Sequence, residues 1–148
     1  MLQFSDWVIW QQRDTIPNIN KPGVYILAKY EPSKVPHPVD PMDEKIICVG
    51  KTTRGLKNRL NEFNGAAFSN GAPHAEGYTY KERFGSDSNG LYVSICPIYF
   101  ATKPVNLPNN EIDTYMSFRV TRFVTFLEVC LRGVYVLTWG KLPELNKE

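Results

Sequence analysis

The sequence is poor in the residues that build disulfide frameworks and structural zinc sites. Its 148 residues include three cysteines and two histidines, which lie far apart and form no CxxC pair: Cys48, Cys96, Cys130, His37 and His74. A structural zinc site needs closely spaced ligands of these types, so we expect none. An odd number of widely spaced cysteines is typical of reduced thiols. We therefore expect an intracellular, cytoplasmic protein.

Long apolar runs and a strong net charge are also missing. No uncharged apolar run approaches the roughly 18 residues that a membrane helix needs, and no basic region precedes an apolar stretch at the start of the chain. We expect neither a membrane span nor a signal peptide. The formal net charge of +2 is too small to indicate a nucleic-acid partner by itself, so such a prediction depends on where the charges lie.

The sequence does contain enough apolar residues for one core. With 43% hydrophobic and 22% charged residues, its composition is that of a globular protein, and its length fits one domain. We predict a single domain over residues 1–148. Residues 1–20, with Trp7 and Trp10, are expected to cap its core. Residues 30–44 contain four prolines and are expected to form a loop.

Apolar runs and their periodicity predict the secondary structure. Short apolar runs predict strands over 23–28, 45–50 and 91–95, and we expect the first two to pair antiparallel. The order of elements, β-β-α-β-α, predicts an α+β fold in which helices flank a small central antiparallel or mixed sheet.

The two predicted helices differ in length. Leu56, Leu60 and Phe63 share one face of a helix over 55–63, and a mostly apolar stretch without proline predicts a long helix over 117–138. Residues 64–90 and 101–110 are expected to be loops, the former with some structure around 78–84.

The central part of the sequence carries a concentrated positive charge. Five cations and no acid lie within residues 45–59: Lys45, Lys51, Arg54, Lys57 and Arg59. Thr52 and Gly55 stand at the predicted strand-to-helix turn, where backbone N–H groups and a helix N-terminus attract phosphate. The functional interpretation of this segment is a phosphate-binding edge, although its charge alone slightly favours the alternative. The alternative is an ordinary solvated basic helix face.

Glu128 is unusual because it lies in the apolar stretch of the long predicted helix. It is the only acidic residue between Asp113 and Glu144, and an ionised carboxylate in apolar surroundings is costly unless something compensates it. Three compensations are open: Arg132 four residues on, a basic partner from elsewhere in the chain, or a divalent cation.

Two further residues can carry chemistry. Tyr25 lies inside an apolar strand, where its simplest role is that of a core tyrosine with a bonded hydroxyl. His74 lies in a glycine-rich segment, where a solvated surface histidine is the simplest interpretation, although histidine also titrates where a general base is useful.

Four elements occur in an order that resembles one enzyme family. They are Gly23-Val24-Tyr25, Cys48-Val49-Gly50-Lys51-Thr52, Arg59 on the first helix and Glu128 on the later one. This ordered set resembles the GIY-YIG nuclease superfamily over most of residues 20–148. The ending Gly140–Asn146 is similar to the family's closing segment, in which an asparagine often approaches the site. Residues 68–80, with His74, resemble a loop of restriction-enzyme-like members.

The resemblance implies hydrolysis of DNA phosphodiester bonds with a single divalent cation, Mg²⁺ or Mn²⁺. It assigns Glu128 to the metal, Arg59 and Lys51 to the phosphate and Tyr25 to the attacking water, with His74 as the alternative base. The remaining predicted substrate-binding residues are Cys48, Gly50, Thr52, Arg54, Lys57 and Asn146.

Cys48 departs from the family's pattern because it stands where the second motif normally has tyrosine. A thiol is a poor hydrogen-bonding partner compared with a phenol. This departure leaves a second hypothesis, a catalytically weak or inactive domain that binds nucleic acid. A third is a structural or partner-binding protein that acts through its tryptophans and proline-rich loop.

Overall fold

The computed structural model describes residues 3–69, 71, 73–99 and 109–147, with the side chains of 109–117 excepted. Its centre is a four-stranded sheet in the order β1-β4-β2-β3, and each neighbouring pair of strands is antiparallel. The strands are β1 (Val8–Ile9), β2 (Gly23–Lys29), β3 (Ile46–Thr52) and β4 (Leu91–Pro97). The predicted antiparallel pairing of the first two apolar runs is therefore confirmed, with β2 inside the sheet and β3 at its edge.

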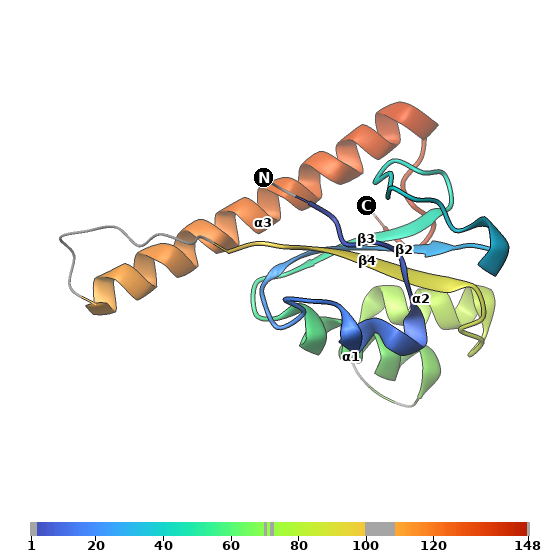
Figure 1. Cartoon of the computed structure of the whole chain (residues 1–148), viewed down its shortest axis with the longest axis horizontal. Coiled ribbons are helices and arrows are strands. Elements are labelled where there is room, and N and C mark those ends of the chain that lie inside the picture. Colours follow the sequence, from blue (N-terminus) through green and yellow to red (C-terminus); the bar gives the residue numbers. More distant parts are fainter. Residues whose placement is uncertain (1–2, 70, 72, 100–108, 148) are drawn as a thin grey trace.

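Helices cover both faces of the sheet (Figure 1). Helices α1 (Leu56–Phe68) and α2 (Ala75–Phe84) lie against one face, and α3 (Asn109–Trp139) runs along the other. Two short 3-10 helices, η1 (Trp10–Thr15) and η2 (Pro32–Lys34), complete the described elements. This arrangement confirms the predicted α+β class.

The alternation of β2 divides its side chains between two apolar clusters. Tyr25 and Leu27 join the cluster beneath α1 and α2, while Val24 and Ile26 join the cluster beneath α3. A strand turns successive side chains to opposite faces, and both faces of β2 are covered, so the strand is apolar without interruption. On α1, the face predicted from periodicity is buried: Leu56, Leu60 and Phe63 have no exposed surface.

The predicted order of elements is wrong in two places. Val8–Ile9 forms the edge strand β1 within the predicted capping segment, and residues 75–84, which were expected to belong to a loop with some structure around 78–84, form the helix α2. Helix α2 has no apolar stripe, and it rests on α1 through Gly77, which lies against Ala66 and Phe63, and through the ring of Tyr80.

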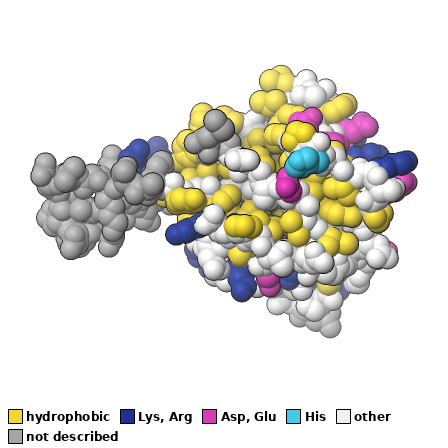
Figure 2. All heavy atoms as spheres, viewed as in Figure 1, with side chains coloured by type: hydrophobic (Ala, Val, Ile, Leu, Met, Phe, Trp, Pro, Cys, Tyr) yellow, Lys and Arg dark blue, Asp and Glu magenta, His cyan; other side chains and the backbone are white. Residues whose placement is uncertain are grey.

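The long helix begins earlier than predicted, since residues 109–116 also belong to α3. The predicted loop over 101–110 lies mainly outside the described residues, and its last two positions are helical. No helix in the described part of the chain is both long and apolar enough to cross a membrane. On the face seen in Figure 2, lysine and arginine side chains lie in small separate groups among apolar and polar ones.

Candidate active site

The ring of Tyr25 defines the floor of the candidate site. Tyr25 on β2 lies opposite Gly50 on β3, and a Cβ at position 50 would overlap the tyrosine ring and its hydroxyl. Glycine at this position therefore lets the phenol lie across the neighbouring strand. The tyrosine side chain is buried, with 1% of the residue exposed.

His74 is the hydrogen-bonding partner of this phenol. The Tyr25 hydroxyl lies 3.1 Å from His74 Nε2, and the imidazole also accepts a hydrogen bond at Nδ1 from the backbone N–H of Gly77, at 3.3 Å. The histidine is thus the N-cap of α2. With 1% of the residue exposed, the interpretation of His74 as a solvated surface histidine is wrong, because α2 buries it against Phe63.

Glu76, which sequence analysis did not single out, extends this pair. Its carboxylate lies 3.3 Å from His74 Nδ1, and the hydrogen bond with His74 lowers the pKa of Glu76 below its ordinary value, against the effect of burial. When Nδ1 carries the proton, it donates to Glu76 and Nε2 accepts from the Tyr25 O–H. When Nε2 carries it, Nδ1 accepts from Gly77 and Nε2 donates to the phenol. In the sequence, the feature that could have indicated Glu76 as a site residue is its position two residues after His74.

The Tyr25 phenol is held in its neutral form. Burial raises the pKa of Tyr25 well above 10.0, and the neighbouring Cys48 and Glu76 raise it further, while Arg59 opposes the rise. A phenol in this environment can donate and accept hydrogen bonds at neutral pH. The phenol can act as a base only after another group has removed its proton.

Arg59 lies at the rim of the site, on α1. Its guanidinium Nη1 is 2.9 Å from Glu62 Oε2, and the other oxygen of Glu62 is 3.1 Å from Arg54 Nη2. The side chain of Arg59 is 28% exposed and that of Arg54 is 76% exposed. Glu62, just beyond the run of five cations in residues 45–59, therefore forms ion pairs with two of them, Arg54 and Arg59.

Glu128 lies on α3, which covers the other face of the sheet from α1 and Arg59. Its side chain is 12% exposed and lies 3.5 Å from Arg132 Nη2, so the first of the three predicted compensations is present. Burial raises the pKa of Glu128 above its ordinary value, although the charges of Arg132 and Lys51 act in the opposite direction. Lys51 is held near the helix by a hydrogen bond of 2.9 Å from its Nζ to Thr125 Oγ1.

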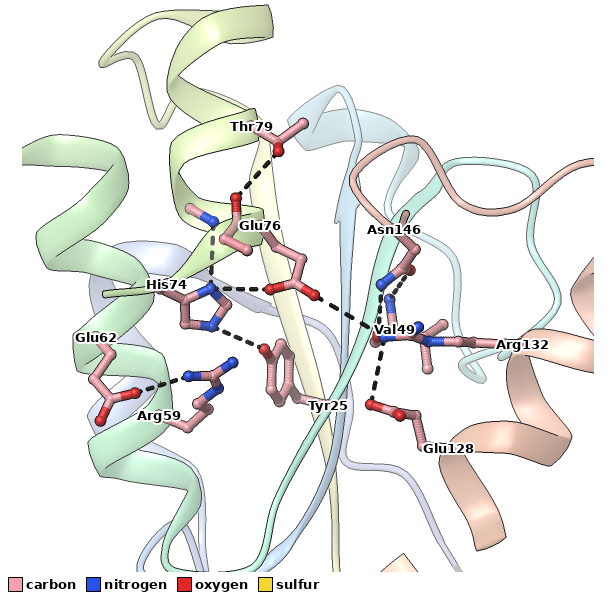
Figure 3. Close-up of polar contacts among 12 residues, drawn as sticks. Tyr25, Val49, Arg59, Glu62, His74, Glu76, Thr79, Glu128, Arg132 and Asn146 are labelled. Atoms are coloured by element: carbon pink, nitrogen blue, oxygen red, sulfur yellow. Dashed lines mark hydrogen bonds and ion pairs between the residues drawn. The ribbon is translucent and has the colours of Figure 1, made fainter. Parts of the chain in front are cut away.

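Arg132 joins the two sides of the site at the outer edge of β3. Its Nη2 lies 4.0 Å from Glu76 Oε1 and 3.5 Å from Glu128 Oε2, and it donates a hydrogen bond of 3.2 Å to the carbonyl oxygen of Val49. Figure 3 shows Tyr25, His74 and Glu76 leading toward Arg132 and Glu128. Side chains from β2, α2 and α3 thus form one polar row around β3.

Two predicted substrate-binding residues contact the protein interior instead. Cys48 has no exposed surface, and burial raises the pKa of its thiol well above 9.0. Asn146 is 7% exposed, and its side-chain amide accepts from Val49 N at 2.8 Å and donates to Val49 O at 2.9 Å. In this structure a substrate does not reach Cys48, and Asn146 fastens the C-terminal segment to β3.

The other predicted residues lie along the rim and the turn. Lys57 is exposed on α1. Thr52 is 7% exposed, and its Oγ1 accepts a hydrogen bond of 3.2 Å from Arg54 N, which shapes the turn between β3 and α1. Lys57 and Arg54 are therefore accessible to a ligand, whereas Thr52 has a local structural contact.

A divalent cation would find few protein ligands here. Among the residues that the structure describes, no three or more histidine, cysteine, aspartate or glutamate side chains are grouped to hold a metal ion. Glu128 nevertheless fits a site of the magnesium type, in which one or two carboxylates bind and water fills the other positions. Its carboxylate is largely desolvated, and its ion pair with Arg132 is long at 3.5 Å.

Comparison with known proteins does not add to this description. No model of a protein family matches the chain, and no curated protein or solved structure matches it.

Proposed function

We propose that this protein is a divalent-metal-dependent DNA endonuclease of the GIY-YIG type. The observation that supports it is the row of contacts around β3 that begins at Tyr25 beside Arg59, passes through His74, Glu76 and Arg132, and ends at Glu128. Arg59 acts electrostatically on both Tyr25 and Glu128. Phosphodiester hydrolysis needs such a set: a base or water-orienting group, a fixed cation and a carboxylate for a metal.

Arg59 is the proposed partner of the scissile phosphate. Its planar guanidinium presents donors in a fork that matches phosphate oxygens, and its 28% exposed side chain lies beside the buried phenol of Tyr25 (Figure 3). Glu62 accepts a hydrogen bond from Arg59 Nη1 and so orients the guanidinium. Lys51, held by Thr125 beside Glu128, adds a second positive charge.

Tyr25, His74 and Glu76 are the proposed proton pathway. The neutral phenol orients the attacking water, and the proton that the water loses passes through the Tyr25 hydroxyl to His74 Nε2. Glu76 Oε2 lies 3.3 Å from Nδ1, so the imidazolium that this transfer forms has a carboxylate as its hydrogen-bonding partner. Tyr25 and His74 are each 1% exposed, so bulk water is excluded from the transfer and the attacking water would have to reach the phenol from the more exposed rim at Arg59.

Glu128 is the proposed ligand of a Mg²⁺ or Mn²⁺ ion. When bound, the ion would polarise the phosphate and stabilise the leaving oxygen. The chain contributes a carboxylate that is fixed on a long helix and packed beside β3, so its position does not depend on a loop.

The test is cleavage of supercoiled and linear DNA with Mg²⁺ and with EDTA. We expect metal-dependent cutting by the wild type and its loss in Glu128→Gln, with the folded state confirmed by circular dichroism. Glu82→Gln makes the same chemical change at an exposed position of α2 and is expected to cut normally. Equal cutting by Glu128→Gln and the wild type would refute the proposed role of Glu128.

A second candidate function is nucleic-acid binding without cleavage. The burial of Cys48 favours it, because the position that carries the second phenol in the resemblance here holds a thiol inside the core. This candidate predicts binding that weakens steeply with salt and no cutting in Mg²⁺ or Mn²⁺. The same cleavage assay, with a binding titration at two salt concentrations, separates the two functions.

A further inference from the structure

Arg132 contacts more groups than Glu128, the acid one helical turn before it on α3. One nitrogen atom, Nη2, faces three oxygen atoms from three elements: Val49 O on β3 at 3.2 Å, Glu128 Oε2 on α3 at 3.5 Å and Glu76 Oε1 on α2 at 4.0 Å. A simple i,i+4 pair on a helix surface would use only the second of these contacts. Arg132 instead lies between two carboxylates that belong to opposite faces of the sheet.

The two carboxylates need this positive charge to lie near one another. Glu76 Oε1 and Glu128 Oε2 both lie within 4.0 Å of Arg132 Nη2, so two like charges share one cation. The side chains are 19% and 12% exposed, respectively, so water screens their charges only in part. A cation among these oxygens therefore stabilises the arrangement.

Carboxylate and carbonyl oxygens are also the ligands that hard divalent cations prefer. We propose that Arg132 is an internal counter-cation that competes with the divalent metal for Glu128 and Glu76, and so sets the metal affinity of the site. This inference rests on the proposed function, which assigns the metal to Glu128. In the absence of metal, Arg132 neutralises the two carboxylates, and a divalent ion drawn to them would displace its guanidinium.

Two other roles for Arg132 make different predictions. If Arg132 served only to stabilise α3, removing its charge would leave metal affinity unchanged. If it served only to bind phosphate, its removal would weaken DNA binding and again leave metal affinity unchanged. Competition predicts both that metal binds more tightly when the arginine charge is removed and that the guanidinium itself changes its contacts when metal binds, because the ion and Arg132 share the same carboxylates.

The test is the affinity for Mn²⁺ alone, measured by calorimetry and by electron paramagnetic resonance of free Mn²⁺. We expect Arg132→Met, which keeps an apolar side chain of similar length, to bind Mn²⁺ roughly tenfold or more tightly than the wild type. Arg132→Lys keeps the charge and should stay near the wild type. Arg122→Met, an exposed position on the same helix, is the matched control and should bind unchanged.

The contribution of Glu76 is tested in the Arg132→Met background. Adding Glu76→Gln should weaken Mn²⁺ binding several-fold, and adding Glu128→Gln should abolish the gain. Equal or weaker Mn²⁺ binding by folded Arg132→Met overturns the competition. Failure of every variant to bind Mn²⁺ overturns the metal site itself and with it the proposed function.

A measurement on the wild type does not depend on any variant folding. The side-chain N–H signals of arginine can be followed by nuclear magnetic resonance during a Mg²⁺ titration. We expect the Arg132 signal to shift with Mg²⁺ while that of Arg122 stays in place. Mg²⁺-dependent shifts at Glu128 without any at Arg132 would overturn the proposal.

Discussion

The phenol ring of Tyr25 lies directly across Gly50, its partner on the neighbouring antiparallel strand. The two residues belong to the two short motifs that are separated by the proline-rich loop, and their contact explains why the second motif contains glycine. Any side chain at position 50 would push the phenol out of its place beside His74.

Gly50→Ala should therefore destabilise the protein and disturb the site. We expect a loss of about 1–3 kcal/mol in the free energy of unfolding, the usual cost of overpacking a core, measured by urea denaturation. Gly133→Ala is the matched control, since a Cβ there meets no atom within 4 Å on α3 and should stabilise the helix by about 0.4–1 kcal/mol. Equal stability of Gly50→Ala and the wild type would contradict the close packing.

His74→Asn should separate the structural role of the histidine from its chemical one. Asparagine is a good N-cap, so α2 should keep its start, whereas the base beside Tyr25 is lost. We expect the fold to persist with a loss of about 1–3 kcal/mol, because the buried Tyr25 hydroxyl loses its partner, and a fall of about 10²–10⁴-fold in the rate of DNA cleavage. His37→Asn, at the exposed histidine, should cut normally. Undiminished cleavage by His74→Asn would remove the histidine from the proton pathway.

Arg59→Ala should slow cleavage more than it weakens DNA binding. Loss of one fixed donor to a developing oxyanion costs about 2.7–4 kcal/mol of transition-state stabilisation, so we expect kcat to fall about 10²–10³-fold. Arg59→Lys keeps the charge without the fork and should retain part of the activity. Arg83→Ala, which breaks an exposed ion pair with Glu144, serves as the control. An unchanged kcat would place Arg59 outside the site.

Glu128→Gln should make the protein more stable near neutral pH. Burial raises the pKa of Glu128 above 4.5, so the folded state binds this proton more tightly than the unfolded chain does. The corresponding stability is present below about pH 4.5 and is lost as the pH rises through the folded-state pKa. In EDTA, thermal unfolding should therefore show a higher Tm for Glu128→Gln at about pH 7 and little difference at about pH 4.

The exposed Glu82→Gln serves as the control and should show no difference at either pH. A lower Tm for Glu128→Gln at neutral pH would mean that its ion pair with Arg132 outweighs the cost of burial.

Cys48→Ala should reduce the sensitivity of the fold to alkali. Burial raises the pKa of the Cys48 thiol well above 9.0, so stability is fully present below pH 9.0 and falls as the pH rises above that value, where the unfolded chain loses the proton first. Thermal unfolding at about pH 7 and about pH 10 should show a smaller decrease in Tm for Cys48→Ala than for the wild type. Cys130→Ala, at an exposed cysteine, should decline as the wild type does.

Several elements of the fold could be predicted because they depend on local pattern. The apolar runs of β2 and β3 are short and bounded by proline and glycine, and the spacing of Leu56, Leu60 and Phe63 places them on one face of α1. Helix α2 was missed because its contact with α1 uses Gly77, a residue that propensity counts against a helix. Its packing, and not its composition, makes it helical.

The sequence by itself determined the order of the motifs, the antiparallel pairing of β2 with β3 and the spacing that puts Arg132 one turn from Glu128. Only the tertiary structure decided that His74 is buried beneath Tyr25, that Asn146 binds the backbone of Val49, and that Glu76 and Glu128 share one guanidinium. The physical reason is that spacing along a helix or strand constrains near neighbours. A contact between distant residues depends on which faces the packed layers bring together.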